Sequence, residues 1–154
     1  MRDLLKSAFT SWPHCLATYV CLIGAGWLLA FGWKPVRVDP PVYPSPLPEA
    51  EARKMAEQAG GKVWSVGFTG SMKPLLQGVE YVVSVSSYQT IKRGEVLIYS
   101  QPYHNKPIIH RAVEKDDDGW IMSGDSAKHT ESWARVTASS YLGTAVAIYR
   151  PVMR

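Results

Sequence analysis

The sequence predicts a mainly β protein, in which a small antiparallel β-sheet or barrel over residues 62–154 follows one transmembrane helix, a proline-rich stalk and a short helix. Three observations carry this prediction. A charge-free apolar run lies near the N-terminus, a cluster of prolines follows it, and the rest of the chain consists of short runs rich in Val, Ile, Tyr and Trp. The length of 154 residues suits one modest domain plus an accessory segment.

Residues 1–34 are expected to form an N-terminal tail and a transmembrane anchor. The stretch from Cys15 to Trp33, CLATYVCLIGAGWLLAFGW, has 19 residues without a charge. As a helix rising about 1.5 Å per residue, it roughly matches a hydrocarbon core about 30 Å thick. A cleaved signal peptide is the alternative, but its apolar region is usually about 7 to 15 residues long. Basic residues flank the stretch almost equally on its two sides, so charge does not set its orientation.

Residues 35–48 and 49–61 are expected to form a stalk and a helix. The first segment, PVRVDPPVYPSPLP, contains six prolines, a density that disfavours helix and sheet and favours extended polyproline II structure. The second, EAEARKMAEQAGG, has good helix formers, acidic residues early and a glycine pair at its end. This pattern predicts a short helix that stops at Gly60 and Gly61.

From Lys62 onward the sequence pattern is typical of short strands separated by turns. Six runs rich in β-branched and aromatic residues are expected to be strands: residues 62–68, 80–88, 95–100, 107–115, 119–124 and 141–150. The sequence DDDG at 116–119 predicts a hairpin turn, because Gly119 can adopt a positive φ. Strands of this number and length make a small, mostly antiparallel sheet or barrel.

Charge and cysteine content exclude some classes of function. Lys and Arg exceed Asp and Glu by 17 to 13, and the surplus is spread along the chain, so the sequence does not favour nucleic-acid binding. Both cysteines, Cys15 and Cys21, lie in the apolar run and form no CxxC pair. They predict no disulfide framework and do not indicate a redox compartment.

Ser71 and His110 are the first candidates for chemistry. Ser71 lies in the stretch GFTGSMKPLL at 67–76, where a serine beside glycine more often serves a turn. In PIIHRAVEK at 107–115, the period of two places His110 on one strand face with Ile108 and Ala112. Taken alone, His110 is a half-buried core histidine.

Four segments together resemble one family. Residues 69–74, TGSMKP, look like the Gly-or-Ser-x-Ser-Met-x-Pro box of type I signal peptidases, and KRGEVLIY at 92–99 is similar to that family's Arg-Gly-Asp-hydrophobic strand. IIHRAV and then SGDSA resemble its third and fourth boxes, in the same order. The resemblance covers about residues 66–148. His110 stands where the bacterial branch has lysine, as in the branch typical of archaea, the endoplasmic reticulum and some Gram-positive bacteria, which implies a Ser-His enzyme.

The chain departs from the family pattern around the acid. Glu95 replaces the usual Asp after Arg-Gly, Ser126 follows Gly124-Asp125 where Asn is common, and Glu131 lies near the place of a second Asp. By triad logic Asp125 is the candidate that orients His110, with Glu131 as a possible secondary acid. A turn carboxylate that caps its own loop remains the alternative for Asp125.

Amide hydrolysis by a serine nucleophile requires the same residue types. A serine hydroxyl is a weak nucleophile that needs a neighbouring base, and imidazole, with a reference pKa of about 6.5, suits that role. The oxyanion hole is assigned to the Ser71 backbone N–H and the Thr69 hydroxyl. Lysines 73, 92 and 106 are the competing bases, but a solvated lysine has a pKa near 10.4 and would have to be buried to act at neutral pH.

These features predict a membrane-anchored serine endopeptidase that cleaves signal peptides from translocated preproteins. Its catalytic domain would lie on the trans side of the bilayer, which is periplasmic, extracellular or lumenal. The substrates would carry small residues before the cut and lie beside a β edge, lined by residues 64–68 and 81–85. No metal or cofactor is required, and the sequence does not show whether accessory subunits are needed.

Two other interpretations differ in class. A β domain of the same descent, catalytically drifted, would act in binding or assembly. A zinc site from His104, His110, His129 and Asp125 is disfavoured, because the histidine spacings match no common ligand pattern and no cysteine contributes.

Overall fold

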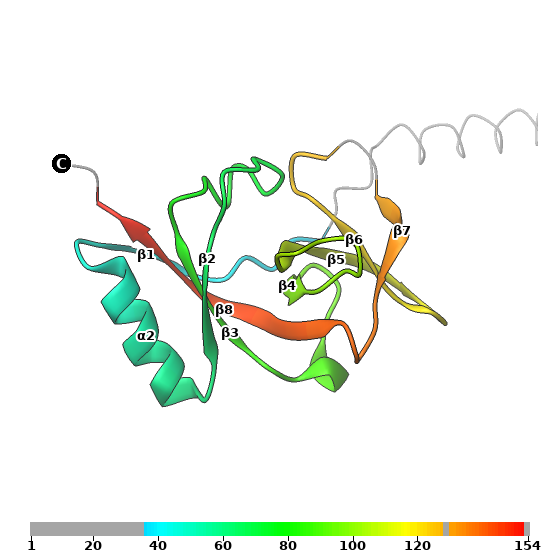
Figure 1. Ribbon diagram of the computed structural model, residues 1–154, viewed down its shortest axis with the longest axis horizontal. Coiled ribbons are helices and arrows are strands. Elements are labelled where there is room, and N and C mark those ends of the chain that lie inside the picture. Colours follow the sequence, from blue (N-terminus) through cyan, green and yellow to red (C-terminus); the bar gives the residue numbers. More distant parts are fainter. Residues whose placement is uncertain (1–35, 128–129, 153–154) are drawn as a thin grey trace, which may run out of the picture. The chain divides into compact units, whose positions relative to one another are not determined.

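Eight strands, one α-helix and one 3-10 turn make up the described part of the chain (Figure 1). The computed structural model describes residues 36–127 and 130–152, without the side chains of residues 131–134. The strands are β1 (Val42–Ser45), β2 (Lys62–Ser65), β3 (Tyr81–Val85), β4 (Val96–Tyr99), β5 (Ile108–Asp116), β6 (Gly119–Ser123), β7 (Glu131–Val136) and β8 (Tyr141–Pro151). The helix is α2 (Pro48–Ala59), and the 3-10 turn η1 spans Tyr88–Thr90.

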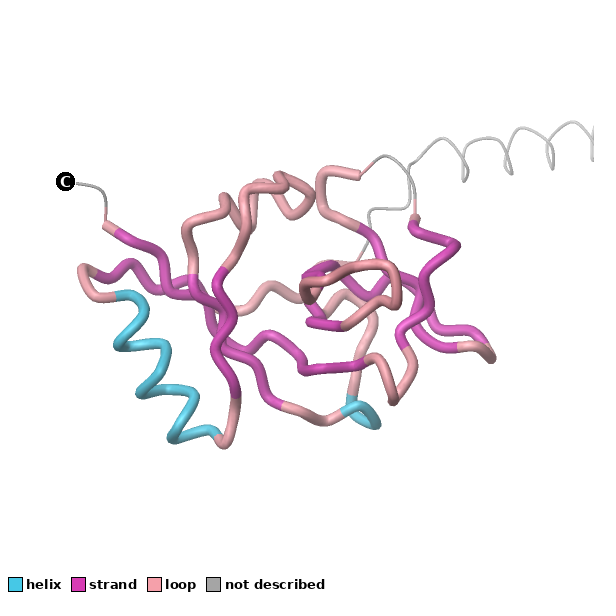
Figure 2. The backbone as a smooth tube through the Cα atoms, viewed as in Figure 1, coloured by secondary structure: helices cyan, strands magenta, loops and turns pink. Residues whose placement is uncertain are grey.

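The mainly β prediction is confirmed. The strands run in the order β2-β3-β8-β4-β5-β6-β7, with every neighbouring pair antiparallel, while β1 pairs with β8 in parallel. Register shifts in four of these pairings let the sheet curl, as the tube in Figure 2 shows. The long strand β8 joins the two parts of this curled sheet, since β3 pairs with its second half and β4 with its first.

The expected membrane anchor lies outside the described residues. The described residues, 36–127 and 130–152, belong to one compact unit. Within residues 36–127 and 130–152, no helix has the length and apolar character needed to cross a membrane.

The proline-rich segment differs from the expected stalk, because part of it belongs to the sheet. Residues 42–45 form β1, and Val42 lies opposite Ile148 in the pairing with β8. Before the strand, the Val38 N–H donates to the Gly94 carbonyl at 3.0 Å, and the Ile148 N–H donates to the Pro41 carbonyl at 2.9 Å. Prolines are tolerated here because, among the described strands, β1 pairs with β8 alone. The second strand that the sequence patterns missed is β7, which lies at one end of the strand order, with β2 at the other end.

Helix α2 confirms the predicted short helix between the prolines and Gly60. Pro48 occupies the first turn, where its missing N–H costs nothing, and Glu49 and Glu51 favour the positive end of the helix dipole. Gly60 ends the helix in the left-handed conformation, with φ of 63°. The two buried residues, Ala52 and Ala56, are small and pack on the sheet at Val83 and Ala147.

The hairpin between β5 and β6 forms at the predicted DDDG turn. The Asp116 carboxylate accepts hydrogen bonds from the N–H groups of Asp118 and Gly119, at 3.1 and 3.0 Å. Gly119 has φ of 137°, which a residue with a side chain rarely adopts. The turn sets the register of β5, and β5 carries His110.

Two hydrophobic clusters support the region around β4 and β5. One contains Leu97, Tyr99 and Ala112 with side chains from β6, β7 and β8, and the other contains Met72, Leu76 and Ile98 with side chains from β3 and β8. Strand β4 contributes to both clusters, because its alternate side chains face opposite ways. The loop that carries Ser71 is fixed by the second cluster.

Candidate active site

Ser71 lies in the loop between β2 and β3, in a turn that packing holds in place. Gly70 has φ of 74°, so the chain turns sharply just before the serine. The next side chain, Met72, is 3% exposed and packs in the hydrophobic cluster with Leu76, which assigns it to the core rather than to an exposed apolar surface. The Leu76 N–H donates to the Met72 carbonyl at 2.9 Å. With Met72 anchored inward, Ser71 remains half-buried at the surface of the loop.

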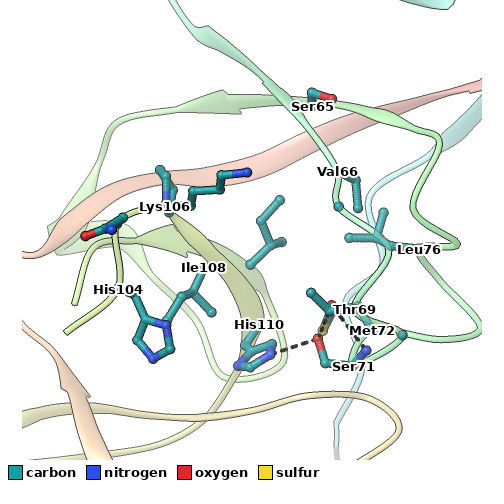
Figure 3. A pocket seen from close by; sticks show the side chains of 15 residues that line it. Ser65, Val66, Thr69, Ser71, Met72, Leu76, His104, Lys106, Ile108 and His110 are labelled. Carbon is teal, nitrogen blue, oxygen red and sulfur yellow. Dashed lines mark hydrogen bonds between the residues drawn. The ribbon is translucent and has the colours of Figure 1, made fainter. Parts of the chain in front are cut away.

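His110 reaches Ser71 from β5, which is 39 residues away in the sequence. Its Nε2 atom lies 3.0 Å from the Ser71 Oγ, as the dashed line in Figure 3 shows. The imidazole is 7% exposed, so its orientation is limited by packing. The structure brings the predicted nucleophile and the predicted base into hydrogen-bond contact, at a distance that would allow proton transfer.

Thr69 lies beside the same hydroxyl. Its Oγ1 atom is 3.1 Å from the Ser71 Oγ, and the Ser71 N–H points at that oxygen from 3.5 Å. The two groups assigned to the oxyanion hole therefore lie within a few ångströms of the candidate nucleophile, on one side of the turn (Figure 3).

A pocket of about 560 Å³ opens over this pair. One wall comes from the end of β2 and the loop after it, and the other from the chain that leads into β5 (Figure 3). The lining residues are Ser65, Val66, Gly67, Thr69, Gly70, Ser71, Met72 and Leu76 on the first wall, and residues 104–110 on the second. Residues 64–68 were expected to line the site, and residues 65–67 of them do, whereas Trp64 and Phe68 are not in the lining. The expected contribution of residues 81–85 is wrong, because β3 pairs with β2 along the sheet and contributes no residue to the pocket lining.

Asp125 does not orient His110, which corrects the triad assignment. Its two carboxylate oxygens accept hydrogen bonds from the Arg111 Nε and Nη2 atoms, both at 2.7 Å. The side chains of both partners are 2% exposed. Because Arg111 follows His110 on a strand, its side chain leaves from the opposite face and draws the carboxylate away from the imidazole.

Arg111 makes further bonds on that face. Its Nη2 atom lies 2.7 Å from the Asp39 carboxylate, and its Nη1 atom donates to the carbonyl oxygens of Gly94, at 2.6 Å, and Val38, at 3.4 Å. Burial would lower the pKa of Arg111, but the hydrogen bonds and charges of the two carboxylates outweigh burial and raise it. The guanidinium therefore stays charged inside the fold.

The loop that holds Asp125 also clamps the serine turn. The Ser126 N–H and hydroxyl both donate to the Ser71 carbonyl, each at 2.9 Å, and the hydroxyl also lies 2.8 Å from the Gly70 carbonyl. A Cβ atom at Gly124 would lie 2.7 Å from the Ser71 carbonyl oxygen, so only glycine permits this approach. Asp125 therefore affects the site indirectly, because its loop holds the Ser71 turn in place.

Sequence reasoning missed Tyr99. Its hydroxyl lies 3.3 Å from the His110 Nδ1, on the side of the ring opposite Ser71. Tyr99 pairs with Ile108 across β4 and β5, so it is the diagonal neighbour of His110 on one sheet face. The signal was available in principle, but it depends on the register of two strands, which the sequence alone does not provide.

The remaining candidates are placed only in part. Glu131 begins β7 and pairs with Met122 through the backbone, but its side chain lies outside the described residues, as does His129. Among the side chains that are described, no three of His, Cys, Asp or Glu gather into a group that could hold a metal ion. Lys106 lines the pocket, whereas Lys73 and Lys92 do not.

The sequence matches no protein-family model and no curated protein. The resemblance to type I signal peptidases therefore rests on the four sequence boxes alone.

Proposed function

We propose that this chain is a serine endopeptidase similar to type I signal peptidases, with Ser71 as nucleophile and His110 as general base, and that it removes signal peptides from preproteins. The observation that carries the proposal is the 3.0 Å contact between the Ser71 Oγ and the His110 Nε2 at the floor of a pocket. A turn serine and a core histidine would not need to meet at an open cleft.

The first half-reaction would follow from this contact. The His110 Nε2 accepts the proton of the Ser71 hydroxyl while the Oγ attacks the scissile carbonyl carbon. The carbonyl oxygen becomes an oxyanion, which the Ser71 N–H and the Thr69 hydroxyl hold by hydrogen bonds. The imidazolium then gives its proton to the leaving amine, the C–N bond breaks, and an ester to Ser71 remains.

The second half-reaction repeats the proton transfer with water. Neutral His110 takes a proton from a water molecule that attacks the ester carbonyl, and the same two donors hold the second oxyanion. The imidazolium returns the proton to the Ser71 Oγ as the acid product leaves. No step needs a group beyond Ser71, Thr69, His110 and the backbone.

The pocket walls support an extended peptide as substrate. Ser65 ends β2, residues 66 and 67 follow it, and residues 108–110 belong to β5, so strand segments border the pocket on two sides. Strand edges bind extended peptides through main-chain hydrogen bonds, and the side chains between them select the residues that fit. Small residues before the cut are the preference that the family resemblance implies.

The anchor and its topology belong to the same proposal. Residues 15–33 would hold the enzyme in the bilayer, and residues 36–152 would lie on the trans side, where translocation makes the cleavage site accessible. Protease digestion of sealed vesicles tests this placement, because a β domain protected on the cytoplasmic side would exclude the signal peptidase function.

The experiment for the activity uses the full chain in detergent micelles with a test preprotein. We expect a single cut after small residues, located by N-terminal sequencing of the product, and no cut when the residue before that bond is replaced by a bulky one. The Ser71→Ala variant is the control for a contaminating protease. Absence of cleavage by well-folded wild type would favour the second candidate, a drifted binding or assembly domain, for which the engagement of Asp125 by Arg111 is the specific observation.

A further inference from the structure

The contact between Tyr99 and His110 places a hydroxyl at the ring nitrogen that faces away from Ser71. Asp125 is held by Arg111, yet a histidine base needs its second ring nitrogen to be fixed. We propose that Tyr99 is a positioning residue, whose hydroxyl oxygen accepts the Nδ1–H of His110 and thereby selects the tautomer that can take a proton from Ser71. This inference rests on the proposed function and concerns the same site.

The argument begins with proton counting. A neutral imidazole carries one N–H, and the nitrogen without hydrogen is the acceptor. For the Nε2 to accept the Ser71 proton across 3.0 Å, the hydrogen must lie on the Nδ1. The Tyr99 oxygen is 3.3 Å from that Nδ1 and can accept from it. The opposite direction, with the tyrosine donating, would place the hydrogen on the Nε2 and leave His110 unable to act as a base.

The position of Tyr99 suits it to this task. The residue is fully buried and belongs to the hydrophobic cluster with Leu97 and Ala112. Its ring centroid lies 6.4 Å from that of His110, with the two planes at 58°. Packing therefore fixes the hydroxyl relative to β5, and lateral rotation of the imidazole would break its bonds at both nitrogens.

A phenol and a carboxylate differ in what they supply. Both can fix the tautomer, but only the carboxylate adds a negative charge opposite the imidazolium that forms during catalysis. We therefore expect the Tyr99 hydroxyl to contribute less to kcat than the carboxylate of a triad acid would. Removing its hydroxyl should lower kcat by about 10- to 100-fold, the range for one hydrogen bond to a charged group, and leave KM within about twofold.

The test is Tyr99→Phe, which keeps the buried ring and deletes the hydroxyl. The readout is nitrogen NMR of the full chain in detergent micelles, labelled with ¹⁵N-histidine and held near pH 8.5, where imidazole is neutral. His110 of the wild type should carry its hydrogen on the Nδ1, and the variant should shift toward the form with hydrogen on the Nε2. Cleavage kinetics should show the fall in kcat.

Tyr88→Phe is the matched control. Tyr88 packs against the same cluster, and its hydroxyl donates to the Val136 carbonyl at 3.1 Å, so its loss should cost stability without altering the His110 tautomer or kcat. An unchanged tautomer and unchanged kcat in Tyr99→Phe would overturn the inference, as would a wild type with its hydrogen on the Nε2. If wild type cleaves nothing but the tautomer still shifts, the proposed function fails and the positioning role of Tyr99 stands.

Discussion

His110 and Arg111 are neighbours on β5, yet their side chains belong to two different environments. His110 faces the pocket, between the Ser71 and Tyr99 hydroxyls. Arg111 leaves the opposite face and binds two carboxylates and two backbone carbonyls. The comparison teaches that the period of a strand can separate reacting groups from structural charge by a single residue. It also explains why the Asp125 carboxylate contacts Arg111 and not His110, since the two side chains leave opposite faces of β5.

The two faces should respond differently to mutation. On the His110 face, a change should alter the rate and leave the fold intact, because His110 lies at the edge of an open pocket and contacts the Ser71 hydroxyl. On the Arg111 face, a change should alter stability first, because a buried charge would lose its partners. Four variants sharpen or break this contrast.

His110→Ala should have the largest effect. Without the base, the Ser71 proton has no acceptor, so cleavage per folded molecule should fall by about 10⁴-fold or more, while the denaturant midpoint changes little. Rate measurements at saturating preprotein, with circular dichroism to verify folding, check this. Retained activity in His110→Ala together with loss in Lys106→Ala would identify the pocket lysine as the base.

Arg111→Met should act on stability. It removes the partner of the buried Asp125 carboxylate, and breaking a buried ion pair from one side costs about 3 to 5 kcal/mol. Urea unfolding of the full chain in micelles measures the loss. Arg135→Met is the control, since the Arg135–Asp116 pair is partly exposed and worth about 1 kcal/mol or less. Equal losses in the two variants would contradict the structural role of the Arg111 face.

Thr69→Val should lower the rate by about 10²-fold if its hydroxyl holds the oxyanion. Valine keeps the shape and removes the donor, so folding should be preserved. Thr69→Ser keeps the hydroxyl and should remain within a few fold of wild type. An unchanged rate in Thr69→Val would give the residue a purely structural role in the turn.

Of the four variants, Glu80→Gln should have the smallest effect, which concerns stability at acid pH. Burial would raise the pKa of Glu80, but the N–H groups of Gln77, Val79 and Gly78 and the side chain of Arg150 outweigh burial and lower the pKa below its ordinary 4.5. Because the folded pKa is the lower one, this contribution is complete above 4.5 and is lost as the pH falls through the folded value.

Glu80→Gln should therefore cost about 1 to 2 kcal/mol at neutral pH and flatten the acid side of the stability curve. Urea midpoints between pH 3 and pH 7, measured at about half-unit steps, follow both effects. Glu49→Gln is the control, because Glu49 pairs with Arg53 on the exposed side of α2. If the urea midpoint of Glu80→Gln falls with pH as steeply as that of wild type, other carboxylates cause the acid sensitivity.

Local patterns predicted most of the fold. Six strands, the helix between Pro48 and Gly60, and the Asp-rich turn all follow from periodicity and from the preferences of proline and glycine. Strand β1 was not predicted, because its prolines are typical of a stalk. It is a strand because it pairs with β8. Strand β7 has charges at Glu131 and Arg135 that obscure its alternation.

The site was predictable where it depends on one segment, and less so where it depends on register. The turn at 69–74 and the face of His110 follow from short-range rules, and the structure places Ser71 and His110 in contact. The partner of Asp125 and the position of Tyr99 depend on how β4, β5 and the 123–127 loop align. A pattern of residues along the chain does not contain that information.

The most direct measurement compares preprotein cleavage by wild type, Ser71→Ala and Asp125→Asn, each expressed per folded molecule. The account predicts cleavage by wild type, none by Ser71→Ala, and a rate within about tenfold of wild type for Asp125→Asn, whose denaturant midpoint should fall. Cleavage by Ser71→Ala, or none by wild type, would contradict the peptidase mechanism. A loss of about 10⁴-fold in Asp125→Asn at an unchanged midpoint would show that Asp125 is the triad acid after all.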